Sequence, residues 1–115
     1  MYQFSYAEIL QDDPHEARLR ERGALEHAIE LLKKAEEKGP RSRESIEALF
    51  FLRKLWTVLI EDLASPENGL PESLRADLIS IGLWIMKEAD LIRSDKSRNF
   101  SGISEICAII RDGLK

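Results

Sequence analysis

Five large apolar residues near the middle of the chain recur at alternating intervals of three and four positions. They are Leu49, Leu52, Trp56, Leu59 and Leu63. Because an α-helix turns once every 3.6 residues, this spacing places all five on one side of a helix, as in packed bundles. Three further apolar residues widen that side: Ala48, Leu55 and Ile60. The pattern predicts a helix over about 42–64 that neighbours cover on more than one side, with the five residues almost fully buried.

Start and stop signals delimit three further helices. Asp13 and Pro14 suit the cap and first position of a helix, and Gly39 suits its end, which predicts a helix over about 14–38 with a solvated first half. Pro71 opens a helix over about 71–93, and a clean apolar stripe from Phe100 to Leu114 predicts a helix over about 100–113. The core side expected for 71–93 comprises Leu74, Leu78, Ile81, Ile85, Ala89 and Ile92.

Only a few polar residues separate these stretches, so consecutive helices are expected to run antiparallel. At 115 residues the chain is long enough for one core. The sequence therefore predicts an all-α fold, a single-domain up-down helical bundle of four main helices over 1–115. Ser5 and Glu8 have the spacing of a capping box, which predicts a short N-terminal helical segment over about 6–11.

The residue types of common catalytic and metal sites are scarce. Cys107 lies in an apolar stripe, where a thiol is neutral and inert. His15 lies at a helix start and His27 on the polar side of a helix, so both are expected on the surface. The chain has no Glu-x-x-His pair on a helix and no glycine-rich phosphate loop. We expect no catalytic, cofactor-binding or metal-binding residues, and no enzyme. No apolar run reaches the length of a membrane span, and the start lacks a signal peptide, so we expect a cytoplasmic protein.

Two groups of apolar residues have no place in the predicted core. One group lies at the N-terminus and the other on the helix over 71–93: Tyr2, Phe4, Tyr6, Ile9 and Leu10, and Leu83, Trp84 and Leu91. In one interpretation the two groups cover each other within the monomer. In the other they form a docking groove for a partner helix. The candidate partner-binding residues are Tyr2, Phe4, Tyr6, Ile9, Leu83, Trp84 and Leu91.

Several segments together resemble the FlaF family of flagellar biosynthesis regulators of alpha-proteobacteria. The segments are Arg53-Lys54-Leu55-Trp56-Thr57, Ile60-Glu61-Asp62-Leu63 and Leu78-Ile79-Ser80-Ile81-Gly82-Leu83-Trp84-Ile85-Met86, with similar first and last residues. The resemblance implies a cytoplasmic, non-enzymatic protein needed for flagellin production after transcription. It also implies opposition to a second regulator, FlbT, which restrains translation of flagellin mRNA.

Three mechanisms are compatible with that resemblance. The protein acts as a flagellin-binding export chaperone, as a translational regulator working through flagellin mRNA or FlbT, or as a homodimeric scaffold. A net charge of −4 and the lack of a basic face with interleaved aromatic residues favour protein over RNA as the direct contact. We expect flagellin as direct partner, no membrane contact and no cofactor, with homo-oligomers left open.

Overall fold

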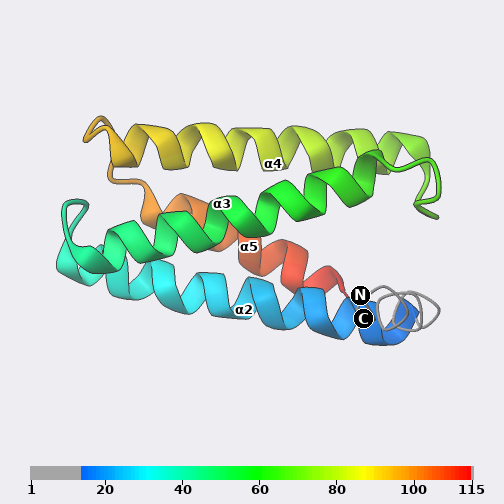
Figure 1. Ribbon diagram of the computed structural model, residues 1–115, viewed down its shortest axis with the longest axis horizontal. Coiled ribbons are helices and arrows are strands. Elements are labelled where there is room, and N and C mark those ends of the chain that lie inside the picture. Colours follow the sequence, from blue (N-terminus) through cyan, green and yellow to red (C-terminus); the bar gives the residue numbers. More distant parts are fainter. Residues whose placement is uncertain (1–13, 115) are drawn as a thin grey trace, which may run out of the picture.

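A computed structural model describes residues 14–114, which form four α-helices and no strand. The helices are α2 (Pro14–Lys38), α3 (Arg43–Ala64), α4 (Glu72–Arg93) and α5 (Phe100–Gly113) (Figure 1). The predicted all-α bundle is confirmed, and the predicted helix bounds agree to within one residue. Ser42 and Pro71 are caps rather than first helical residues. The helical segment predicted over about 6–11 lies outside the described residues.

The turn between α2 and α3 shows why the chain reverses there. Gly39 has a φ of 100°, a left-handed conformation that glycine adopts without steric cost, and its N–H donates to the Ala35 carbonyl at 2.8 Å. The Ser42 hydroxyl donates to the Gly39 carbonyl at 2.7 Å and accepts from the Ser45 N–H at 3.0 Å. These bonds satisfy backbone groups at the end of α2 and at the start of α3. As a result α2 ends, and α3 begins, within a few residues.

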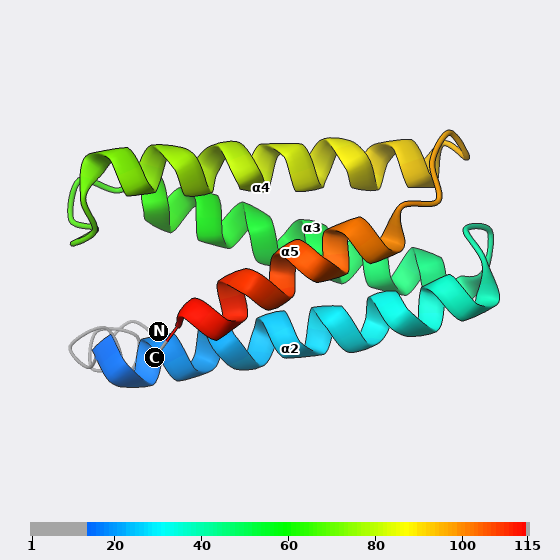
Figure 2. The same cartoon turned by 180° about the vertical axis from the view of Figure 1, so that it is seen from behind.

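The four helices are packed unevenly around the bundle. α3 lies between α2 and α4, and α2 also lies along α5. α5 runs diagonally from the end of α4 towards the start of α2, so α4 and α5 approach closely only near the start of α5 (Figure 2). There, the Asn99 side-chain amide donates to the Glu88 carboxylate at 2.9 Å. Beyond that contact the backbones of α4 and α5 diverge.

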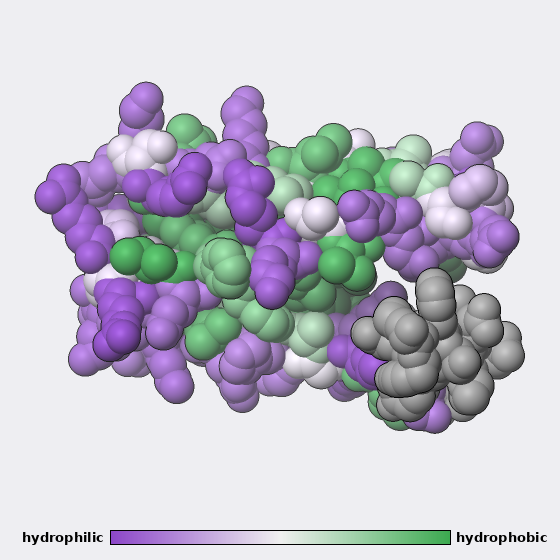
Figure 3. All heavy atoms as spheres, viewed as in Figure 1, coloured by the Kyte–Doolittle hydropathy of each residue, from purple (hydrophilic) through white to green (hydrophobic). Residues whose placement is uncertain are grey.

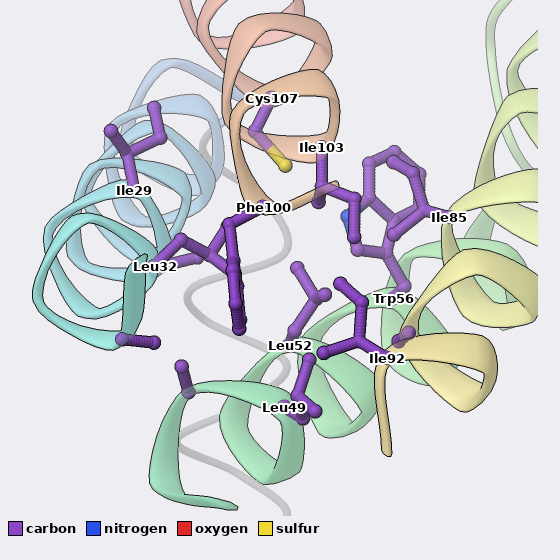
Figure 4. Packing of buried hydrophobic residues seen from close by; sticks show 14 of the residues in the cluster. Ile29, Leu32, Leu49, Leu52, Trp56, Ile85, Ile92, Phe100, Ile103 and Cys107 are labelled. Carbon is purple, nitrogen blue, oxygen red and sulfur yellow. The ribbon is translucent and has the colours of Figure 1, made fainter. Parts of the chain in front are cut away.

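We call the two ends of the bundle the closed end and the open end. The closed end holds the last half of α2, the first half of α3, the last half of α4 and the first half of α5. The open end holds the other half of each helix. The core is densely packed at the closed end and extends to Trp56, near the middle of α3, whose ring lies near Ile85 and Ile103 (Figure 4). The largest fully buried apolar side chains are Trp56, Phe100, Leu25, Leu32, Leu52, Ile85, Ile92 and Ile103.

Some of the predicted core residues towards the open end are less buried than expected. Leu49, Leu52, Trp56 and Leu63 are buried as expected, but Leu59 is only half-buried, so that part of the prediction is wrong.

Along α4, the burial of the predicted core residues decreases towards the open end. Ile85 is fully buried, Leu78 and Ile81 are half-buried, and Leu74 is 42% exposed. The divergence of α5 from α4 is the physical reason, because it removes one neighbour from the first half of α4.

Candidate functional site

The structure places three of the seven candidate partner-binding residues. Leu83 and Trp84 are 56% and 40% exposed, and Leu91 is half-buried. The other four, Tyr2, Phe4, Tyr6 and Ile9, lie outside the described residues. We call Leu83, Trp84 and Leu91 the α4 ridge.

Helix geometry divides the α4 ridge into two sides. Consecutive residues of a helix are about 100° apart, whereas residues seven positions apart nearly coincide. Leu83 therefore shares its side of α4 with Asp90, whose carboxylate accepts a hydrogen bond from Arg53 of α3. Trp84 shares its side with Leu91, towards α5. A partner bound along α3 and α4 contacts Leu83 most directly.

A cavity between α3 and α4 lies on their outer surface at the closed end. We call it the α3–α4 groove; its volume is about 610 Å³. Apolar residues of both helices line it, namely Ile46, Leu49, Phe50, Ala89 and Ile92. Ile46 and Phe50 are 66% and 65% exposed, unusually high for residues of the helix that lies between two neighbours. Hydrophobic residues gather along α3 and over α4 on this face (Figure 3).

Charged side chains border the apolar floor of the α3–α4 groove. Arg53 donates to the Asp90 carboxylate at 2.7 Å, and Arg41 donates to the Asp95 carboxylate at 2.7 Å. The hydrogen bond from Arg41 and its charge hold the pKa of Asp95 below its ordinary value. Arg93 lies 3.8 Å from the Asp90 carboxylate. These ion pairs are exposed to solvent and contribute little stability, but they neutralise most of the charge at the border.

A second cavity, which we call the end groove, lies at the open end and has a volume of about 530 Å³. All four helices contribute apolar residues to it: Leu25, Trp56, Leu59, Leu63, Leu78, Ile110 and Leu114. Glu21 and Asp62 also line it. Burial raises the pKa of Glu21, and the negative charge of Asp62 raises it further. The end groove thus combines an apolar floor with carboxylates at its edge.

The structure places the single cysteine and one of the two histidines of the chain. Cys107 is buried, and burial raises the pKa of its thiol to about 11. The nearby indole of Trp56 opposes that shift, although the Nε1 geometry falls short of a hydrogen bond. His27 is exposed and packs edge-on against Phe51, with ring centroids 4.8 Å apart.

Across residues 14–114, no group of three or more His, Cys, Asp or Glu side chains is placed to hold a metal ion. None of the helices described there combines the length and hydropathy needed to cross a bilayer.

Comparison with known proteins identifies the family. The family model described as "Flagellar protein FlaF" matches residues 2–114. The chain belongs to the FlaF family. No curated protein and no solved structure matches it. The resemblance noted in the sequence is therefore confirmed, and this FlaF-family member is a flagellar protein.

Ile46 and Phe50 of this FlaF-family protein are two exposed apolar residues that the sequence pattern did not single out. A signal for them was present, because α3 carries apolar residues around most of its circumference. Ile46, Phe50, Arg53 and Thr57 succeed one another at intervals of three and four, which makes a second side of α3 distinct from the core side. Two neighbouring helices leave that second side uncovered.

Proposed function

We propose that this FlaF-family protein binds flagellin directly, as a non-enzymatic, cytoplasmic chaperone that promotes flagellin synthesis or export after transcription. The observation that carries the proposal is the α3–α4 groove, where Ile46 and Phe50 stay exposed beside a densely packed core. Exposed apolar surface of this kind is typical of protein interaction sites.

The shape of the α3–α4 groove suits one side of an amphipathic helix. Two roughly antiparallel helices form its walls, and its floor is apolar over the length of Ile46, Leu49 and Phe50. A helix that presents apolar residues at intervals of three and four fits such a groove. Leu83, on the same outer surface of α4, extends the contact towards the open end.

The charges of the described residues favour a protein partner over RNA. The arginines at the groove, Arg41 and Arg53, already bond to Asp95 and Asp90, so they offer little unpaired positive charge to a phosphate backbone. The chain as a whole carries a net charge of −4, which repels nucleic acid.

Two alternatives use the same surface and become outcomes of the test. In one, the protein regulates translation by binding flagellin mRNA or FlbT. In the other, the α3–α4 groove joins two copies into a homodimeric scaffold.

The deciding experiment titrates purified protein against flagellin, flagellin mRNA leader and FlbT at low and moderate salt. We expect saturable flagellin binding that changes little with salt, because an apolar contact is weakly screened. RNA binding that falls steeply with salt, without flagellin binding, would overturn the proposal. Binding to FlbT alone, or dimerisation that abolishes flagellin binding, would also contradict it.

Matched variants connect the binding to the surface. Phe50→Ala and Leu83→Ala should each weaken flagellin binding by about 1–2 kcal/mol, with a smaller loss for Trp84→Ala, while leaving the melting temperature nearly unchanged. Ile109→Ala is the control, because Ile109 is an equally exposed apolar residue on α5, away from the groove. Equal losses for Phe50→Ala and Ile109→Ala would show that binding is not specific to the α3–α4 groove.

A further inference from the structure

We propose that the thirteen residues preceding Pro14 occupy the end groove of their own chain. The groove is apolar, lies at the end of the bundle where α2 begins, and is incompletely covered by the four helices. This proposal concerns a different surface from the α3–α4 groove and does not depend on the identity of the partner.

The end groove has more apolar surface than its own helices cover. Leu59, Leu78, Ile110 and Leu114 are only half-buried, although each lies on the core side of its helix. Leu70, in the loop before α4, is exposed at the edge of the groove. Burying such side chains gains free energy in proportion to the area removed from water, so an apolar segment that reaches them is stabilised there.

The preceding segment starts at the edge of this groove. Ala17 and Arg18 line the groove and follow Pro14 by only three and four residues, or about 5–6 Å along the helix axis. Thirteen residues span about 20 Å as a helix and about 45 Å when extended. The segment therefore reaches every part of the groove without any movement of the bundle.

The apolar residues of the segment are spaced to match a groove. On a helix, Tyr6, Ile9 and Leu10 share one side, and Tyr2 lies one turn before Tyr6 on that side. A helix as short as this one is only marginally stable in water by itself. Its apolar side would also be exposed to solvent. Packing against the end groove provides the tertiary contact that it lacks.

The polar groups also complement one another. Glu21, Asp62 and Glu67 line the groove with carboxylates, which accept hydrogen bonds when ionised. Tyr2 and Tyr6 supply phenolic hydroxyls that donate. Burial and the negative charge of Asp62 raise the pKa of Glu21. A hydrogen bond donated by a tyrosine hydroxyl would stabilise the ionised Glu21 carboxylate and so oppose that shift.

One of the two interpretations left open by the sequence is that the N-terminal residues cover an apolar surface of their own chain. The surface proposed here is a different one from that interpretation. The sequence paired the N-terminal residues with Leu83, Trp84 and Leu91, whereas the end groove is lined by all four helices at the open end. The α4 ridge and the α3–α4 groove then remain free for a partner.

A spin label at position 3 of the full chain tests the proposal directly. Gln3→Cys supplies the attachment site, since native Cys107 is buried and its raised pKa keeps it unreactive. We expect paramagnetic broadening of the amide signals of Leu70, Leu78 and Leu114, and none at the closed end around Ser45. Broadening centred on Leu83 and Leu91, or no localised broadening, would overturn the proposal.

Two controls separate this result from other occupants. Mixing labelled protein with isotope-enriched unlabelled protein detects contact between copies, and broadening in that mixture would show that the groove holds a second copy. Tyr6→Ala combined with Ile9→Ser should remove the localised broadening while the helical circular dichroism stays unchanged.

A matched pair of substitutions on α4 measures how much the N-terminal segment contributes to packing at the end groove. Leu78→Ser should lower the melting temperature of the full chain more than that of a variant lacking residues 1–11, because part of its packing is with the segment. Leu83→Ser should lower both equally. Flagellin binding should survive deletion of residues 1–11. If the deletion abolishes flagellin binding, and Leu78→Ser lowers the melting temperature equally with and without the segment, the segment belongs to the partner site instead.

Discussion

The closed and open ends of the bundle are built from the same four helices, yet their packing differs. At the closed end, Leu32, Leu52, Phe100 and Ile103 are at most 2% exposed. At the open end, Leu59 and Leu78 are only half-buried, although their spacing along the chain resembles that of the closed-end residues. The difference shows that a correct apolar stripe guarantees burial only where all neighbouring helices stay close.

The path of α5 explains the contrast. Near its start, the hydrogen bond from Asn99 to Glu88 keeps α5 beside α4. Towards its end, the ion pair between Arg111 and Glu26, at 2.6 Å, ties it to α2 instead. α5 therefore crosses the bundle diagonally and leaves the first half of α4 with one neighbour fewer (Figure 2).

The largest expected effect is at the middle of the core, at Trp56. Trp56→Ala should lower the free energy of unfolding by about 3–5 kcal/mol, because Trp56 is almost completely buried among three helices. Leu74→Ala, at the open end, should cost less than about 1 kcal/mol. Chemical denaturation measures both, and equal losses would contradict the contrast between the ends.

The Cys107 thiol provides a pH-dependent test of core burial on α5. Its raised pKa means that the native state keeps its proton while the unfolded chain loses it, so stability is present below about pH 9 and falls towards pH 11. The loss reaches about 2–3 kcal/mol relative to Cys107→Ala measured over the same pH range. A thiol reagent that modifies the native protein rapidly at neutral pH would show that the core is open there.

Gly82 of α4 faces the side chains of Trp56 and Ile60 of α3. A Cβ at this position would lie 2.7 Å from Cε3 of Trp56, so Gly82→Ala should destabilise the protein by about 1–3 kcal/mol. Gly23→Ala is the matched control, since nothing lies within 4 Å of its Cβ and alanine is favoured in helices. A stabilising Gly82→Ala would mean that α3 and α4 are farther apart than described.

The smallest effects concern two glutamates of α2. The raised pKa of Glu21 means that the folded state disfavours its negative charge, so stability is lost as pH rises above about 4.5. Glu21→Gln removes that charge and should therefore raise stability slightly at neutral pH. Glu26→Gln should lower stability slightly by breaking the ion pair with Arg111. Each change should stay below about 1 kcal/mol in thermal unfolding. The same sign for both variants would contradict the different surroundings of the two side chains.

Sequence patterns predicted the elements of this fold better than their relative placement. Helix bounds followed from local signals such as Pro14, Gly39 and Pro71, which act within a few residues of the chain. The half-burial of Leu59 depends on the diagonal path of α5, which no local pattern encodes.

The candidate site was predicted only in part for the same reason. Leu83 and Trp84 lie outside the helical core, and whether they bind a partner stays a prediction. The exposure of Ile46 and Phe50 depends on how much of α3 its two neighbours cover. That coverage is a property of packing, and periodicity alone does not determine it.

Amide hydrogen exchange of the full chain, with and without flagellin, tests the central claim most directly. The claim is that the partner binds the α3–α4 groove and the adjoining side of α4. We expect flagellin to slow exchange over residues 46–53 and 83–93, and to leave residues 70–78 and 110–114 unchanged. Slower exchange at 70–78 and 110–114 without any change at 46–53 would contradict the account.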